Sequence, residues 1–168
     1  MSPMFVPGPV DVEDMVLAAQ TQPMLPHRSD EFEKIYRRAW QKSQQLFFTE
    51  APVFIVTSSG TGLQEAAIRN LAKRDVLSCV NGAFSQRWFE VAKSNGKCAY
   101  KLEVAWGQPV TPQAVAEALT EKENEVITLV HNETSTGVQN PIREIAAVVH
   151  SLSPVSYTHL TLPTILLV

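Results

Sequence analysis

The chain has 168 residues, of which 45% are hydrophobic and 18% charged, and its formal net charge at pH 7 is -3. This length allows one substantial core, and the charge balance gives no electrostatic reason to expect nucleic acid or an anionic membrane as a partner. No basic leader precedes an apolar run, and no run reaches the roughly 18 residues of a membrane span, so we expect a cytoplasmic protein, with an organelle signal at the true C-terminus left open.

The first 50 residues predict an N-terminal arm and a lead-in helix. Proline-rich turns flank a short helical stretch, and a longer helix is expected from about Ser29, a favourable N-cap, to Phe48. Its apolar stripe consists of Phe32, Ile35, Tyr36, Ala39 and Trp40.

From residue 53 onward, short β-branched runs alternate with amphipathic stretches. This alternation predicts an α/β fold with a mostly parallel sheet flanked by helices, in a domain of residues 51–154. The expected strands are 53–57, 76–80, 99–104 and 125–130. The expected apolar helix stripes are Leu63, Ala66, Ala67 and Leu71; Phe84, Trp88, Val91 and Ala92; Val115, Ala118 and Leu119; and Ile142, Ile145, Ala146 and Val149.

The last segment, 155–168, has a different character. Its composition suits a strand, but Pro163 is awkward in a central one. It is either a divergent strand in a naturally short protein or foreign sequence joined to a truncated reading frame, since 156–164 resembles translated sequencing-adaptor sequence. We favour a non-native tail, because a sheet that ends after its fourth unit exposes an apolar edge.

The most informative turn is Thr-Ser-Ser-Gly-Thr-Gly at 57–62, between a predicted strand and a helix expected to open at Gly62. Small residues let a ligand approach, and the unpaired N–H groups of a helix start can cradle a phosphate. A dinucleotide fingerprint fails here, because Glu65 occupies the third glycine position and the second strand ends without an acid. A plain tight turn with a helix cap remains the alternative.

Four segments together carry a family resemblance. They are the opening Pro7-Gly8-Pro9, the turn at 58–62 with Glu65-Ala66-Ala67, the stretch 81–88 and the loop 131–138. In this order and spacing they resemble class V aminotransferases, the fold-type I pyridoxal-phosphate enzymes that include serine–pyruvate and alanine–glyoxylate aminotransferases. The resemblance covers about residues 5–152 and implies an incomplete fold-type I large domain.

The resemblance implies roles for particular residues. Ser59, Gly60 and Thr61 match the residues that hold the phosphate of pyridoxal 5′-phosphate, and Phe84 matches the aromatic ring that stacks on the pyridine. From the residues alone, Phe84 could instead belong to the core with Trp88. Thr134 matches the hydroxyl residue that reaches the ring-oxygen side of the cofactor. Gly8 matches the arm that lines the substrate pocket with backbone groups. The alternative for the loop around Thr134 is a solvated polar turn.

The resemblance also implies a transaminase that moves an amino group from serine or alanine to glyoxylate or pyruvate and that is a homodimer at full length. In the family the Schiff-base lysine and the acid at the pyridine nitrogen come from later strands, so we expect no catalytic residue in this chain and no activity from it alone. Two alternatives stay open: a non-catalytic phosphate-ligand module, and a cysteine desulfurase of the same fold. Cys79 lies in a predicted strand and Cys98 directly before one, and these strand-like positions are poorly suited to that nucleophile; the spacing of the two predicts free thiols and no metal site.

Overall fold

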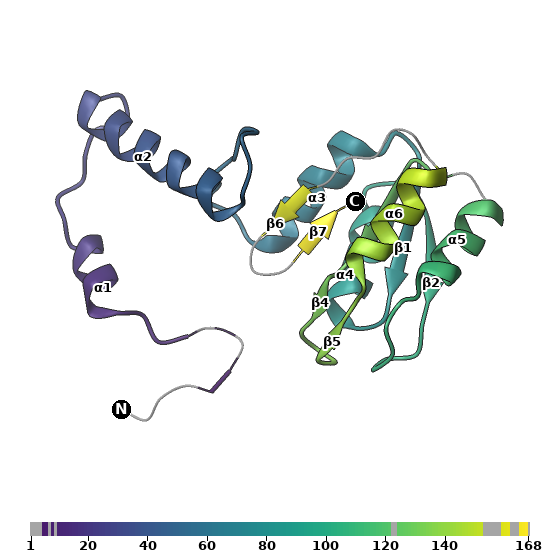
Figure 1. Ribbon diagram of the computed structural model, residues 1–168. Helices are drawn as coiled ribbons and strands as arrows, with labels where there is room; N and C mark the ends of the chain where they lie inside the picture. Colours follow the sequence, from purple (N-terminus) through teal and green to yellow (C-terminus); the bar gives the residue numbers. More distant parts are fainter. Residues whose placement is uncertain are drawn as a thin grey trace. The chain divides into compact units, whose positions relative to one another are not determined.

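The computed structural model (Figure 1) describes residues 5, 6, 8, 10–121 and 124–152, and the backbone of 159–161 and 165–167. Its contacts divide the chain into two units, Met1–Val56 and Thr57–Val168. The helices are α1 (Asp14–Gln20), α2 (Asp30–Leu46), α3 (Gly60–Leu71), α4 (Ala83–Ser94), α5 (Pro112–Glu121) and α6 (Ile142–Leu152). The strands are β1 (Asp75–Val80), β2 (Cys98–Glu103), β3 (Val126–Leu129), β4 (Asn132–Glu133), β5 (Val138–Gln139), β6 (His159–Thr161) and β7 (Ile165–Leu167).

The first unit contains α1 and α2. The predicted cap of α2 is confirmed, since Ser29 Oγ accepts a hydrogen bond from Phe32 N at 3.2 Å and acidic residues fill the first turn. None of the residues of α2 is buried, and Phe32 and Ile35 are 37% and 51% exposed. The predicted apolar stripe is therefore present but stays uncovered in this unit, because such a stripe is buried only where a second element packs on it.

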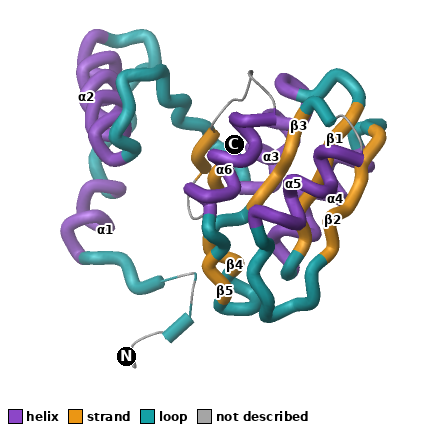
Figure 2. Tube along the Cα trace, turned by 45° about the vertical axis from the view of Figure 1, so that its right-hand side comes forward, coloured by secondary structure: helices purple, strands orange, loops and turns teal. Residues whose placement is uncertain are grey.

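The second unit is built around a sheet of strand order β2-β1-β3-β7-β6. β1 lies between β2 and β3 (Figure 2) and pairs in parallel with both, as the βα alternation predicts, while β7 is antiparallel to β3 and β6 is antiparallel to β7. The backbone forms strands at β6 and β7, in agreement with the strand that the composition of the tail suggests. The assignment of 155–168 as a separate non-native tail remains a prediction, and Pro163 lies outside the described residues.

Helices cover both faces of the parallel strands. Side chains alternate along β1, so that Val76 faces one cluster while Leu77 and Cys79 face the other. The cluster under α3 and α4 consists of Ala67, Ile68, Ala72, Val76, Trp88, Val91, Ala92 and Val130. The cluster under α5 and α6 consists of Leu77, Cys79, Val110, Val115, Ile127, Leu129, Ile145 and Val149. The predicted α/β class, a sheet between two helical layers, is confirmed.

The predicted strand at 53–57 is wrong. These residues form no regular element, and Phe54, Ile55 and Val56 are 80%, 46% and 51% exposed. An extended apolar run becomes a strand only when a neighbour completes its hydrogen-bond ladder, and none of the described strands pairs with this run.

Helix α3 and the loop after β3 also differ from expectation. α3 begins at Gly60, two residues before the predicted start, and it buries Gln64, Ala67 and Ile68 while Ala66 is exposed. The polar loop expected at 131–140 contains a small hairpin of β4 and β5, closed by a turn with Gly137 at φ 71°. The sequence pattern thus located the helix but not its rotation about its own axis.

Candidate functional site

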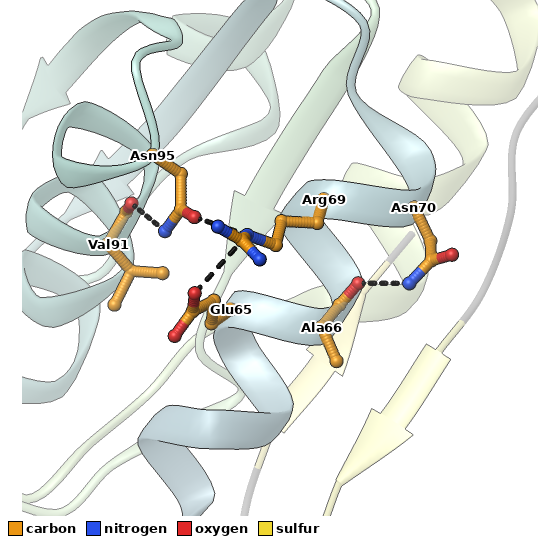
Figure 3. Close-up of polar contacts among 6 residues, drawn as sticks. All are labelled: Glu65, Ala66, Arg69, Asn70, Val91 and Asn95. Atoms are coloured by element: carbon orange, nitrogen blue, oxygen red, sulfur yellow. Dashed lines mark hydrogen bonds and ion pairs between the residues drawn. The ribbon is translucent and has the colours of Figure 1, made fainter.

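The first turns of α3 and α4 lie at the same edge of the sheet. Three residues separate α3 from β1 and two separate β1 from α4, and with such short connections both helices run opposite to β1. Their C-terminal turns are joined by a hydrogen bond from Arg69 Nε to Asn95 Oδ1 at 2.7 Å, and Glu65 holds the same guanidinium at 3.2 Å (Figure 3). Two helix N-termini, each with a partial positive charge, therefore point to the carboxyl edge of β1.

The start of α3 presents an open set of donors. Ser59 Oγ accepts a hydrogen bond from Gly62 N at 3.2 Å, while the N–H groups at a helix start have no acceptor within the helix. A Cβ on Gly60 would meet nothing within 4 Å, whereas a Cβ on Gly62 would collide with the Ser58 side chain. Gly60 thus leaves this turn accessible, and Gly62 allows Ser58 to pack against it.

The start of α4 is closely covered by the loop after β3. A Cβ on Gly82 would lie closer than 3.0 Å to the side chain of Glu133 and 2.6 Å from Ser135 Oγ. The φ of Gly82 is 177°, an extended conformation open to any residue, so it is this close approach that requires glycine. The loop after β3 is therefore packed directly on the first turn of α4.

Glu133 is the central group of this contact, and it is 0% exposed. Its Oε2 accepts hydrogen bonds from Ser85 N and Ser85 Oγ, both at 2.8 Å. Its Oε1 accepts from Phe84 N at 3.3 Å, from Ser135 Oγ at 2.6 Å and from Ser135 N at 3.3 Å. A carboxylate at a helix N-terminus with this many donors is stabilised in its charged form.

These contacts set the ionisation of Glu133. Burial acts to raise the pKa of its carboxyl, but the hydrogen bonds from Ser135, Ser85 and Phe84 lower it, and the net result is a pKa below the ordinary value. The native state therefore binds fewer protons than the unfolded state in the acid range. The stability contributed by Glu133 is fully present above the unfolded pKa of about 4.3 and is lost as the pH falls through the lower, native pKa.

We accordingly expect Glu133→Gln to flatten the dependence of unfolding free energy on pH below about pH 4.3. Urea denaturation at a series of acid pH values measures this pH dependence of the unfolding free energy. Hydrogen bonds from Arg74 N and then Lys73 N also lower the pKa of Glu125, so the single variant keeps a residual slope and the double variant with Glu125→Gln loses more of it. An acid slope equal to that of the wild type in Glu133→Gln would contradict the expectation.

A second buried pair anchors the same edge. Asn140 Oδ1 accepts from Val110 N at 2.8 Å and from Asn81 Nδ2 at 3.1 Å, while Asn140 Nδ2 donates to Val130 O at 2.6 Å. Asn81 and Asn140 are 0% and 1% exposed. The ends of β1 and of the hairpin are thereby held together by side-chain amides whose polar atoms are paired.

The comparisons with known proteins decide the family. The family model described as aminotransferase class-V matches residues 13–157. This chain belongs to the class V aminotransferase family. It is 38% identical over 149 residues to an uncharacterised aminotransferase of Methanocaldococcus jannaschii, a match over 87% of this chain and 39% of that protein. It is 36% identical over 145 residues to a serine–glyoxylate aminotransferase of Methylorubrum extorquens, over 83% of this chain and 36% of that one.

A solved structure adds the fold. An alanine–glyoxylate aminotransferase of Nostoc superposes with a TM-score of 0.81 at 26% identity, over 90% of this chain and 43% of that one. The chain thus spans about two-fifths of the length of the relatives that it matches. The resemblance seen in the sequence is confirmed at the level of family and fold.

The class V site residues expected from the sequence fall on both helix starts. Ser59, Gly60 and Thr61 form the start of α3, and Phe84 is the second residue of α4. Phe84 is 48% exposed while Trp88, one turn further, is fully buried, so the expectation that Phe84 shares the core stripe is wrong. Phe84 lies in the first turn of α4, where its half-exposed ring is accessible to a ligand.

Thr134 lies in the same contact but points away from the core. It is exposed, and both of its neighbours, Glu133 and Ser135, bond to the first turn of α4. The structure therefore brings the segments of Phe84 and Thr134 together, 50 residues apart in the sequence. Gly8 belongs to the other unit, and its place in a substrate pocket remains a prediction.

Glu133, Ser85 and the two asparagines were missed as site residues. The available signal was a glutamate in a hydroxyl-rich loop directly after a buried strand, followed by Ser135. A lone glutamate in a polar loop is far more often solvated, so only the packing shows its role.

Three further reactive side chains, Cys79, Lys97 and Lys101, have defined surroundings of their own. Cys79 is buried in β1, and burial raises the pKa of its thiol to about 12, which makes a thiolate nucleophile there unfavourable. Lys97 Nζ donates to Ala72 O at 2.6 Å at the opposite edge of the sheet, and Lys101 lies over the ring of Phe89. Among the described residues, no three His, Cys, Asp or Glu side chains form a metal-binding group, and none of the helices is long and apolar enough to cross a membrane.

Proposed function

We propose that this chain carries the phosphate-binding and ring-stacking part of a pyridoxal 5′-phosphate site in a transaminase. The observation that carries the proposal is the shared edge of α3 and α4. The start of α3 is open at Ser59 and Gly60, whereas the start of α4 is filled by Glu133 and exposes Phe84 beside it. One helix start is left for an anion, and the other offers an aromatic face.

The donor set at α3 suits a phosphate monoester. Ser59 Oγ uses a lone pair to cap Gly62 N, so its hydrogen is free to donate to a phosphate oxygen. The N–H groups of Gly60 and Thr61 and the hydroxyl of Thr61 are the further donors. Charge-assisted hydrogen bonds contribute about 1.5 to 3 kcal/mol each, so this set is sufficient without a lysine or arginine.

Phe84 and Thr134 would hold the ring. A flat pyridine stacks on an aromatic side chain with a gain of roughly 0.5 to 1.5 kcal/mol beyond area burial. The Thr134 hydroxyl can form a hydrogen bond with the oxygen substituent of the pyridine ring. When bound, the cofactor supplies an electron sink for the loss of the α-proton of an amino acid. The described residues orient this group, and none of them is assigned the proton transfer.

For the whole protein we propose transfer of an amino group from serine or alanine to glyoxylate or pyruvate, by a homodimer with Gly8 in the substrate pocket. The family and the names of the similar serine–glyoxylate and alanine–glyoxylate enzymes support this. Formation of glycine from glyoxylate with each donor is the assay. A strong preference for a dicarboxylic donor would contradict the proposed substrate class.

The cofactor site is tested by Ser59→Ala. We expect the dissociation constant of 4-deoxypyridoxine 5′-phosphate to rise about tenfold, since one charge-assisted hydrogen bond is lost. This probe has no aldehyde and cannot bond to a lysine, so isothermal titration calorimetry reports the pocket alone.

Ser29→Ala is the matched control for this test. Ser29 and Ser59 cap their helices with the same 3.2 Å hydrogen bond, so each substitution costs about 1 kcal/mol of capping, but only Ser59 faces the proposed ligand. Equal affinities in Ser59→Ala and the wild type would sink the phosphate assignment. If Phe84→Ala leaves the affinity unchanged while Ser59→Ala lowers it, the chain is a phosphate-binding module without a ring site.

A further inference from the structure

Glu133 is a buried charged group to which the proposed function gives no role. Within the part of the chain that the structure describes, no ion pair includes it, so its charge is balanced by dipoles alone. The nearest positive end is the N-terminus of α4, whose second and third N–H groups, those of Phe84 and Ser85, donate to it.

Two serines complete the connection between loop and helix. Ser135 Oγ donates to Glu133 Oε1 and accepts from Ala83 N at 2.9 Å. Ser85 Oγ donates to Glu133 Oε2 and accepts from Asn81 N and Gly82 N, both at 3.0 Å. The first three N–H groups of α4 therefore all end on side chains of residues 133 and 135.

These bonds surround the two residues that would hold the ring. Phe84 lies between Ala83 and Ser85 on the helix, and Thr134 lies between Glu133 and Ser135 on the loop. Each neighbour takes part in the contact, while Phe84 and Thr134 keep their own side chains exposed. A shift of the loop relative to α4 would change the separation of the ring and the hydroxyl.

We propose that Glu133 is a positioning residue that sets the Thr134 hydroxyl against the Phe84 ring for a phosphorylated pyridine. This inference rests on the proposed function. A second consequence follows from charge: because the carboxylate already occupies the start of α4, it repels a further anion there, and the phosphate is left to α3.

The variant Glu133→Gln tests the inference in the full chain. The amide has the same size, but its NH₂ replaces one acceptor oxygen and faces N–H donors, so hydrogen bonds on that side are lost. We expect 4-deoxypyridoxine 5′-phosphate to bind about tenfold more weakly. The affinity for inorganic phosphate should change by less than about twofold, because the groups proposed to donate to it are on α3. Amide hydrogen exchange at Phe84 and Ser85 should become faster without any ligand.

Glu125→Gln is the matched control. Its exposed carboxylate accepts hydrogen bonds from Lys73 N at 2.7 Å and Arg74 N at 2.8 Å at the opposite edge of the sheet, so Glu125→Gln makes the same chemical change and loses backbone hydrogen bonds away from the site. It should change the affinity of neither ligand. Ser135→Ala gives an independent test, since it keeps the carboxylate but removes the bridge to Ala83, and it should weaken the pyridine ligand by about threefold and leave phosphate unchanged.

The outcomes separate the two proposals. If wild type binds the pyridine ligand and both Glu133→Gln and Ser135→Ala bind it equally well, Glu133 has no positioning role and the cofactor site stands. If both ligands weaken by the same factor in Glu133→Gln, the residue is merely structural and the inference is overturned. If the wild type binds neither ligand, the proposed function fails and takes this inference with it.

Discussion

Replacing Trp88 by alanine is expected to lower the free energy of unfolding by about 4 kcal/mol, the largest effect of any single truncation in the α3–α4 layer. Trp88 is 0% exposed and belongs to the cluster with Ile68, Val91 and Val130 that joins two helices to the sheet. Removing the indole leaves a cavity between rigid elements that cannot close. Urea denaturation followed by far-UV circular dichroism measures the change.

Trp88→Phe is the informative control. The Trp88 indole nitrogen is buried, and no acceptor for it lies among the described residues. Phenylalanine therefore removes volume without breaking a hydrogen bond, and the expected cost is about 1 to 2 kcal/mol. A cost for Trp88→Phe as large as that for Trp88→Ala would show that the indole N–H is bonded and that packing is not the main term.

Gly82→Ala has the second largest expected effect, a loss of about 3 kcal/mol. The new methyl group would overlap the Glu133 side chain and Ser135 Oγ, neither of which can move without breaking hydrogen bonds to the first turn of α4. Thermal and urea denaturation report the loss. The same variant should bind 4-deoxypyridoxine 5′-phosphate poorly, since the loop and α4 are pushed apart.

Gly60→Ala provides the contrast at the other helix start. A Cβ there meets nothing within 4 Å, and alanine favours the helix, so the unfolding free energy should change by no more than about 0.5 kcal/mol. The proposed phosphate would still lose room against the backbone, and its affinity should fall. Equal stability losses in Gly60→Ala and Gly82→Ala would contradict the packing described at Gly82.

Local features of the sequence predicted most of the regular elements. Ser29 caps α2 as expected. Thr111 caps α5 in the same way, since Thr111 Oγ1 accepts a hydrogen bond from Ala114 N at 3.2 Å. The β-branched runs form β1, β2 and β3, with every bound within one residue of the predicted one. Caps and hydrophobic periodicity depend on neighbours along the chain, which a single sequence contains.

The candidate site was predictable only in part. The glycine and hydroxyl turn at 57–62 pointed to an anion site, and the family resemblance named Phe84 and Thr134. The burial of Phe84 was mispredicted when it was placed with Trp88, since a helix pattern does not say where the sheet stops covering it. The strand predicted at 53–57 is wrong for a similar reason. Apolar composition does not show whether a neighbouring strand is present to complete the hydrogen-bond ladder.

The α/β class, the family, the helix caps and the glycine-rich start of α3 follow from the amino-acid sequence alone, because they depend on local chemistry and on spacing along the chain. Three features become visible only in the folded chain: α3 and α4 begin at the same edge of the sheet, the packing around residue 82 requires glycine, and Glu133 binds the first turn of α4. These contacts join residues that are far apart in the sequence, from 26 positions for Arg69 and Asn95 to 52 for Ala83 and Ser135, and the burial that makes a carboxylate depend on its hydrogen bonds exists only after the sheet has formed.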